Sequence, residues 1–307
     1  MSLPDFQTVM LPLLQFLADG KERSATEQLA ALSSHFALSD EDRAKLLPSG
    51  RQTVIANRVG WSRTYMKKAG LLVTPRRGVA QITDEGRKVL AEKPDKITVS
   101  FLKAKYPSFV AFHEAGNEDE ALTTNGTDTP KLVEIETPQE RLEKSYLQMR
   151  TELTAELLER VLSCSPAFFE QLVVDLLVAM GYGGSAADAG QSIGKSGDDG
   201  IDGIIKEDRL GLDIIYLQAK RWQGSVGRPT IQSFAGSLEG YRARKGVLIT
   251  TSTFTAEARE YVTRIEKKIV LIDGKSLAQL MIDHDVGVAV QKTFDLKRID
   301  SDYFETE

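Results

Sequence analysis

Apolar residues recur every three or four positions through most of the first hundred residues, a spacing that places them on one side of a helix. Two short β-type runs enclose the turn Pro75-Arg76-Arg77-Gly78. The pattern predicts helices over 3–18, 24–36, 54–69 and 84–91, and strands over 71–74 and 79–83. Helices combined with a hairpin whose tip is basic are typical of a winged helix, a relative of the helix-turn-helix.

From residue 151 onward, amphipathic segments alternate with short apolar runs. Ser165 suits a helix N-cap and Pro166 suits the first helical position, and the helix that they begin should stop at Gly181. The other predicted helices are 151–162, 230–242, 256–266 and 276–283, and the predicted strands are 201–205, 213–219, 247–251 and 269–272. This alternation predicts an α/β fold with a partly parallel, mixed sheet flanked by helices.

An acidic stretch, 113–145, separates these two patterns. It holds nine acidic residues against three basic ones, carries turn formers and lacks a sustained apolar period. We therefore predict a mainly helical winged-helix domain over 1–95, an acidic linker region over 96–145 and an α/β domain over 146–307.

Length and composition narrow the class of protein. With 307 residues, of which 41% are hydrophobic, the chain can form two cored domains. A single cysteine, Cys164, cannot form an intramolecular disulfide, which favours a reducing compartment. The first 20 residues lack a basic start and a cleavage site, and no run of 18 apolar residues occurs. We expect a cytoplasmic protein that is not secreted and does not span a membrane.

The net charge of -5 would argue against a nucleic-acid partner if it were spread evenly. Between Arg51 and Thr83, however, seven basic residues occur without an acidic one, interleaved with Trp61 and Tyr65. The alternative is that these residues form an ordinary solvated face, but the basic residues without an acidic one, interleaved with aromatics, favour DNA contact. Trp61 is a candidate for contact with a methylated base, although a place in the core is favoured. The candidates are Arg58, Arg63, Lys67 and Lys68 on the helix, and Arg76 and Arg77 at the hairpin tip.

The strongest chemical signal lies between Gly197 and Trp222. In a strand over 213–219 and its end, Gln218 and Lys220 share one face, because residues two apart point the same way. A short connection predicts a hairpin that returns both residues beside Asp202. We therefore expect Asp202, Gln218 and Lys220 to converge.

This trio suits phosphodiester hydrolysis. Mg²⁺ prefers oxygen ligands and commonly uses one or two carboxylates together with substrate phosphate oxygens, so Asp202 and the Gln218 amide oxygen fit a magnesium site. A lysine beside the metal can orient a water and offset charge at phosphorus. A structural carboxylate at Asp202 and a surface ammonium at Lys220 are the alternatives, which the pairing of these residues disfavours.

The chain resembles a known family at these residues. Asp202 followed by Gln218-Ala219-Lys220 resembles the Asp...(Asp/Glu)-x-Lys nuclease core in its Gln-x-Lys variant. The stretches GDDGIDG, QAKRW, FFEQLVVDLLVAMGYGG and GVLITTSTFTAEA resemble the catalytic domain of the Mrr restriction endonucleases. The segment ANRVGWSRTYMKKAGLL with its basic hairpin resembles the N-terminal winged-helix domain of that family.

The resemblance implies a type IV, modification-dependent DNA endonuclease with an N-terminal reader and a restriction-endonuclease-like catalytic domain. It assigns catalysis to Asp202, Gln218 and Lys220, and matches Glu170 to an acidic position that can complete such sites. The alternative for Glu170 is an acid that suits the dipole at the start of its helix. Asp199 stands where relatives more often have glycine, and we interpret it as a loop carboxylate. An amide at 218 supplies no charge, so Glu170 or Asp199 would have to compensate in metal binding.

The main hypothesis is a Mg²⁺-dependent endonuclease, with Mn²⁺ as a substitute, that cuts double-stranded, methylated DNA as a homodimer or higher oligomer and associates with the nucleoid when bound. One alternative is a non-catalytic DNA-binding sensor, against which the intact trio argues. Another is a junction or repair nuclease with the same core, which the match of the N-terminal segment disfavours.

Overall fold

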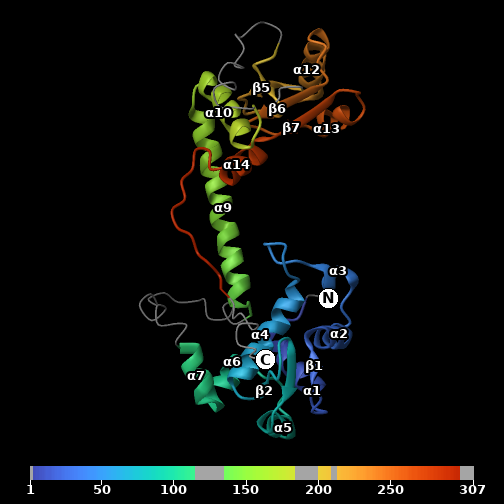
Figure 1. Ribbon diagram of the computed structural model, residues 1–307, viewed down its shortest axis with the longest axis vertical. Helices are drawn as coiled ribbons and strands as arrows, with labels where there is room; N and C mark the ends of the chain where they lie inside the picture. The colour runs from blue at the N-terminus through green and yellow to red at the C-terminus, as the bar shows by residue number, and fades with distance from the viewer. Residues whose placement is uncertain (1–2, 115–134, 184–199, 209–212, 298–307) are drawn as a thin grey trace. The chain divides into compact units, whose positions relative to one another are not determined.

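The computed structural model describes residues 3–114, 135–183, 200–208 and 213–297 (Figure 1). Contacts divide the chain into two units, one within residues 1–147 and one comprising residues 148–297. None of the helices in these described ranges has the length and apolar character needed to cross a bilayer.

The N-terminal unit combines helices with a small antiparallel sheet. Its helices are α1 (Phe6–Phe16), α2 (Ala25–His35), α3 (Asp40–Ala44), α4 (Val54–Lys68), α5 (Asp84–Ala91), α6 (Val99–Lys105) and α7 (Pro107–Glu114). Its strands are β1 (Arg23–Ser24), β2 (Leu72–Val73) and β3 (Val79–Ile82), in the order β1-β3-β2. The four helices and the hairpin expected from periodicity are therefore present.

Helices α1 and α4 form the centre of this unit. Met10 and Leu13 of α1 and Met66 of α4 are fully buried. Tyr65 of α4 meets the rings of Phe6 and Phe109 edge-on, at centroid distances of 5.5 and 5.4 Å. The apolar sides of both helices pack in this core. The other face of α4 therefore carries polar residues.

Helices α6 and α7 lie within the range 96–145 that was predicted as linker. Ile97, Leu102 and Phe109 are fully buried in the N-terminal core. The acidic bias starts only near His113, and the residues before it carry enough apolar side chains to pack. The N-terminal unit therefore extends well past residue 95.

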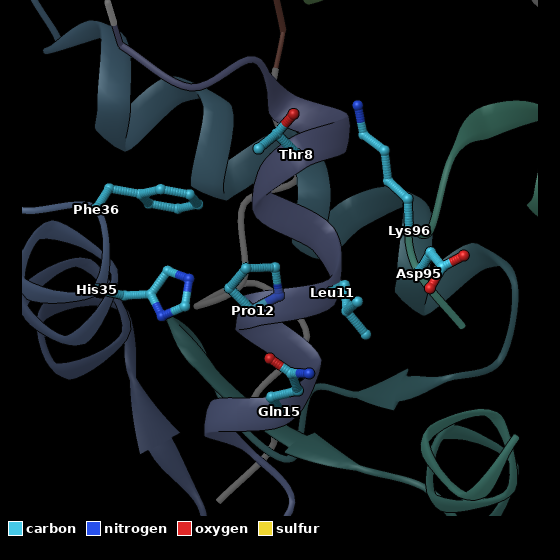
Figure 2. Close-up of a pocket in the computed structure, with 8 residues that line it drawn as sticks. All are labelled: Thr8, Leu11, Pro12, Gln15, His35, Phe36, Asp95 and Lys96. Atoms are coloured by element: carbon cyan, nitrogen blue, oxygen red, sulfur yellow. The ribbon is translucent and has the colours of Figure 1, made fainter. Parts of the chain in front are cut away.

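One cavity of about 410 Å³ opens on the side of α1 that faces away from the core (Figure 2). It combines apolar and polar side chains, with the ring of His35 edge-on to that of Phe36 at 4.8 Å. The lining residues are Thr8, Leu11, Pro12, Gln15, His35, Phe36, Asp95 and Lys96. None of them was among the predicted site residues.

The C-terminal unit is built on a mixed four-stranded sheet. Its strands are β4 (Gly203–Lys206), β5 (Ile214–Lys220), β6 (Lys245–Thr250) and β7 (Lys268–Ile272), in sequence order, with β4 antiparallel to β5 and the others parallel. Its helices are α9 (Pro138–Ser163), whose first turns belong to the N-terminal unit, α10 (Pro166–Ala179), α12 (Arg228–Gly240), α13 (Ala256–Thr263) and α14 (Gly274–Asp283). This confirms the predicted α/β class with a partly parallel sheet.

The two faces of the sheet have separate cores. Ile215 and Leu217 of β5 pack with residues of α9, α10 and α14. Tyr216 points to the other face, which carries α12 and α13. Gly246 of β6 lies against α12, where a Cβ atom would come within 2.8 Å of the Phe234 ring. The alternation predicted for β5 is thus present, and it directs every second residue of that strand to the α12 side.

Candidate functional site

Asp202, Gln218 and Lys220 converge where β4 begins and β5 ends. The Asp202 N–H donates to the Leu217 carbonyl at 2.8 Å, and the Ala219 N–H donates to Asp202 Oδ2 at 2.7 Å. Lys220 Nζ lies 3.9 Å from the same Oδ2 atom. Strand pairing therefore fixes the Asp202 carboxylate beside the Lys220 ammonium.

Gln218 is buried, with 4% of its surface exposed. Its Nε2 donates to the Gly200 carbonyl at 2.6 Å, which fixes the amide orientation. Its Oε1 is buried and has no hydrogen-bond partner among the described residues. A buried amide oxygen normally has a partner, because leaving it without one costs about 1–3 kcal/mol. Among the described residues, this oxygen is therefore a candidate ligand atom.

Gly200 makes this arrangement possible. Its φ of +74° lies in the left-handed region, and a Cβ atom there would lie 3.1 Å from Gln218 Nε2. A side chain at this position would therefore strain the turn and press on the amide. Glycine allows the backbone to approach Gln218 and accept its hydrogen bond.

The Lys220 backbone is held by the neighbouring strand. Its carbonyl accepts hydrogen bonds from Thr250 Oγ1 at 2.8 Å, from the Trp222 N–H at 3.0 Å and from the Thr251 N–H at 3.3 Å. The Thr251 hydroxyl in turn donates to the Trp222 carbonyl at 2.8 Å. The chain beyond β5 is thus fixed, while the Lys220 side chain remains 25% exposed.

Glu170 belongs to the same electrostatic group. It lies in the first turns of α10, whose N-cap Ser165 accepts from the Phe168 N–H. Burial, and then repulsion from the Asp202 carboxylate, raises the pKa of Glu170 above its ordinary value, and the Lys220 ammonium partly offsets this. A carboxylate that is poorly stabilised beside another carboxylate is a favourable position for a cation. Asp199 lies outside the described residues.

These groups form a set of hard oxygen donors. Asp202 and Glu170 supply carboxylates and Gln218 supplies an unpaired amide oxygen, the ligand types that Mg²⁺ and Mn²⁺ accept. In the described parts of the chain, no cluster of three or more His, Cys, Asp or Glu side chains could hold a metal. The candidate site is therefore two carboxylates completed by an amide oxygen.

The basic residues of α4 separate into different environments. Arg63 is half-buried and Lys67 is exposed, and they are four positions apart on one side of the helix. Burial lowers the pKa of Arg63, and neither side chain has a hydrogen bond or ion pair with another described residue. One turn earlier, a Cβ atom on Gly60 would meet nothing within 4 Å, so this side of α4 is open. Lys68 lies 4.9 Å from the centroid of the Phe112 ring.

The hairpin tip carries Arg76 and Arg77, which are both exposed. Arg76 Nε lies 3.4 Å from Glu22 Oε2, and its side chain is 72% exposed. Such an exposed ion pair contributes little and can exchange partners. Trp61 packs partly buried against the core beside Tyr65, which confirms its predicted place in the core.

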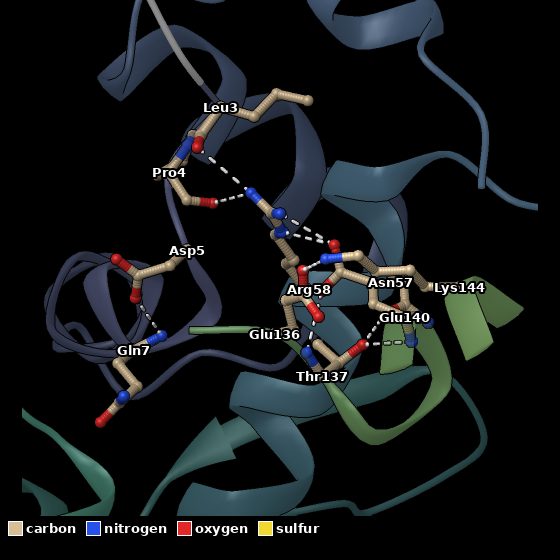
Figure 3. Close-up of polar contacts among 10 residues, drawn as sticks. All are labelled: Leu3, Pro4, Asp5, Gln7, Asn57, Arg58, Glu136, Thr137, Glu140 and Lys144. Carbon is tan, nitrogen blue, oxygen red and sulfur yellow. Dashed lines mark hydrogen bonds and ion pairs between the residues drawn. The ribbon is translucent and has the colours of Figure 1, made fainter. Parts of the chain in front are cut away.

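Arg58, which was grouped with the DNA-contacting residues, has a different place (Figure 3). Its Nε and Nη2 donate to Glu140 Oε1 at 3.0 and 2.8 Å, and its Nη1 donates to the carbonyls of Leu3 and Pro4 at 3.1 and 2.8 Å. Only 14% of the Arg58 side chain and 9% of the Glu140 side chain are exposed. Because its guanidinium is saturated by buried partners, Arg58 is a structural residue.

Two carboxylates, an amide and a lysine at the end of paired strands form a donor set suited to phosphodiester hydrolysis. The sequence matches identify the family. Residues 161–281 match a family model described as "Restriction endonuclease", and residues 6–92 match one described as "Mrr N-terminal domain". The chain is 38% identical over 308 residues to the type IV methyl-directed restriction enzyme EcoKMrr of Escherichia coli K12, covering 99% of this chain and 100% of the relative. The chain therefore belongs to the Mrr family of restriction endonucleases.

Among solved structures, the chain matches the MspJI restriction endonuclease in complex with a 27-mer oligonucleotide. The match has a TM-score of 0.27 and 18% sequence identity, and it covers 52% of this chain and 35% of that chain.

Proposed function

We propose that this protein is a metal-dependent endonuclease that hydrolyses phosphodiester bonds of double-stranded, methylated DNA. Asp202, Gln218 and Glu170 would hold Mg²⁺, for which Mn²⁺ can substitute, and Lys220 would act on the attacking water. The observation that carries this proposal is the buried Gln218 Oε1, which has no hydrogen-bond partner among the described residues, in the site that pairs Asp202 with Lys220.

When bound, the metal would supply a Lewis acid that polarises the scissile phosphate and lowers the pKa of a coordinated water. The Ala219 N–H engages Asp202 Oδ2, which orients the carboxylate. Lys220 can orient the attacking water through a hydrogen bond and offset the negative charge that develops at phosphorus. Glu170, whose pKa is raised in the absence of a cation, would lose its proton more readily beside one.

The N-terminal unit would hold the DNA. Arg63 and Lys67 form the proposed contact on α4, because burial has weakened the solvation of the Arg63 guanidinium without supplying a partner. Lys68, Arg76 and Arg77 would contribute phosphate contacts at the edges of this surface. The relative in Escherichia coli is described as methyl-directed, and we extend that property to this chain. Its place of action would be the cytoplasm, at the nucleoid.

The test uses plasmids that carry or lack cytosine or adenine methylation, incubated with purified protein in Mg²⁺ or in EDTA. We expect cleavage of a methylated plasmid in Mg²⁺ and none in EDTA. Equal cleavage of all plasmids would remove the methylation reader and keep the nuclease. DNA binding without cleavage of any plasmid would support the non-catalytic sensor instead.

A further inference from the structure

An exposed tryptophan follows the candidate site in the sequence. Trp222 lies two residues beyond Lys220, is 44% exposed and belongs to neither core of the C-terminal unit. Single exposed apolar residues are common on protein surfaces and mean little by themselves. Trp222 differs from such residues because its main chain is fixed and because it adjoins Lys220, which would act at the scissile phosphate.

The main chain around Trp222 is held by neighbouring elements. Its N–H donates to the Lys220 carbonyl at 3.0 Å, and its own carbonyl accepts a hydrogen bond from Thr251 Oγ1 at 2.8 Å. The preceding residue, Arg221, donates from Nη1 to the Leu162 carbonyl near the end of α9 at 2.7 Å. These bonds fix the place from which the indole ring projects.

The next three residues continue this fixed edge, and the stretch Trp222–Ser225 is called the β5 rim below. All four of its residues are exposed. Ser252 Oγ donates to the Gln223 carbonyl at 3.1 Å, and Ser225 Oγ lies 3.2 Å from Thr253 Oγ1. The β5 rim is therefore exposed to solvent and at the same time bonded to the loop that follows β6.

The side chains of the β5 rim decide which part of a DNA strand they suit. They are an indole, an amide and a hydroxyl, without a charge, and a Cβ atom on Gly224 would meet nothing within 4 Å. Attraction to phosphates comes mainly from lysine and arginine, whereas an aromatic ring stacks on bases of any sequence. The indole N–H of Trp222 has no hydrogen-bond partner among the described residues, which makes it a candidate donor to DNA.

We infer that Trp222 packs against the apolar sugar and base surface of the nucleotide next to the scissile phosphate. Only one residue separates it from Lys220, whose ammonium lies 3.9 Å from the Asp202 carboxylate. A contact there would hold the strand so that the phosphate lies at these two groups. The inference rests on the proposed function, because it adds a DNA contact to the same site. Trp222 would bind DNA and take no part in proton transfer.

The first measurement follows the fluorescence of Trp222 itself. The chain has two tryptophans, so Trp61→Phe leaves Trp222 as the only one. Asp202→Asn is added to remove a proposed metal ligand and keep the bound DNA intact in Mg²⁺. A sugar or base that covers the indole replaces the water around it, so we expect the emission to be quenched or shifted as methylated duplex DNA is added. Unchanged emission at a DNA concentration that saturates fluorescence anisotropy would overturn the inference.

The second measurement compares variants of the otherwise native chain. Trp222→Ala removes the ring, and Trp222→Phe keeps an aromatic ring at this position. Tyr241→Ala is the matched control, because Tyr241 is a 48% exposed aromatic residue whose ring meets that of Tyr216, four residues back along β5 from Lys220. Circular dichroism checks folding. Single-turnover cleavage at increasing protein concentrations separates the half-saturating concentration from the maximal rate.

Trp222→Ala should raise the half-saturating concentration by about tenfold, which lies within the range for removing one aromatic contact with nucleic acid. Trp222→Phe should recover most of this loss, and Tyr241→Ala should match the wild type. A rise of less than about twofold in folded Trp222→Ala, well below what a stacked ring contributes, would overturn the inference. An equal rise in Tyr241→Ala would do the same.

The two measurements separate this inference from the proposed function. The emission measurement keeps Trp222 in place, so it decides the question even where Trp222→Ala does not fold. A wild-type chain that binds DNA but does not cleave it would contradict the proposed function, and the emission of Trp222 would still test the DNA contact. Normal cleavage by the wild type together with unchanged emission would overturn the contact alone.

Discussion

Replacing Arg58 with alanine should destabilise the N-terminal unit rather than weaken DNA binding directly. The guanidinium makes two hydrogen bonds to Glu140 and two to main-chain carbonyls, all in a region that excludes most water. Without it, the Glu140 carboxylate would stay in place with a single remaining anchor, the Thr137 N–H at 2.9 Å. The variant thus leaves a buried charge uncompensated.

The size of the effect follows from this geometry. Removing one partner of a buried ion pair costs about 3–5 kcal/mol, and the two orphaned carbonyls act in the same direction. A domain of this size is stable by about 5–15 kcal/mol, so the loss is a large share of the total. With a urea slope of about 2 kcal/mol per molar, a loss of about 3 kcal/mol lowers the midpoint by about 1.5 M.

The chain offers a selective assay, because it has two tryptophans, one in each unit. In a Trp222→Phe background, urea unfolding followed by fluorescence reports the N-terminal unit through Trp61, which packs against that core. Arg58→Ala, Glu140→Ala and the double variant form a cycle that isolates the coupling between the two side chains.

A midpoint within about 0.3 M of wild type for Arg58→Ala would refute this reasoning, since it corresponds to less than about 1 kcal/mol. An intact fold combined with a shallower salt dependence of DNA affinity would return Arg58 to the DNA-contacting group.

Three further outcomes are expected. Alanine at Arg63 or Lys67 should weaken binding to DNA of any sequence. The slope of the logarithm of affinity against the logarithm of salt concentration, measured by fluorescence anisotropy, should become shallower by about one for each phosphate that is no longer neutralised. An unchanged slope would exclude phosphate contact. Without metal, Glu170→Gln should raise the melting temperature at pH 7 but not at pH 4. The pKa of Glu170 is raised in the folded protein, so its ionised form destabilises the fold and stability is lost as pH rises through that pKa. An equal change in melting temperature at both pH values would contradict the raised pKa of Glu170. Gly200→Ala should slow DNA cleavage even where the variant remains folded, because the added Cβ presses on Gln218 Nε2. A wild-type cleavage rate in this variant would show that the orientation of the Gln218 amide is unimportant.

The convergence of Asp202, Gln218 and Lys220 at the candidate site could be predicted because it depends on local geometry. Period-two alternation placed Gln218 and Lys220 on one side of β5, and a hairpin returned that strand beside Asp202, as the pairing of β4 with β5 shows. The Gln218 oxygen has no partner among the described residues, and this could not be predicted, since it depends on where the Gly200 carbonyl lies.

The place of Arg58 could not be predicted, because its partner Glu140 is 82 residues away. Helical spacing shows which basic residues share a helix, and only the tertiary structure shows which are already paired. A sequence signal did exist for the start of α9. Thr137 and Glu140 form a capping box in which the Thr137 N–H donates to Glu140 Oε2 and the Glu140 N–H donates to Thr137 Oγ1, with Pro138 at the first helical position. The acidic composition around it concealed that signal.

The most direct test of the active-site assignment measures single-turnover cleavage of a methylated DNA substrate in Mg²⁺ by Asp202→Asn and Lys220→Met, beside Lys268→Met as a matched control. Lys268 is an exposed lysine in the same sheet, on β7, outside the proposed site. We expect both site variants to bind DNA with wild-type affinity and to cleave it at least about 100-fold more slowly. A loss of this size is typical of removing one group that stabilises a transition state. The control variant should cleave at the wild-type rate. Cleavage within a few-fold of wild type by either site variant would contradict the account.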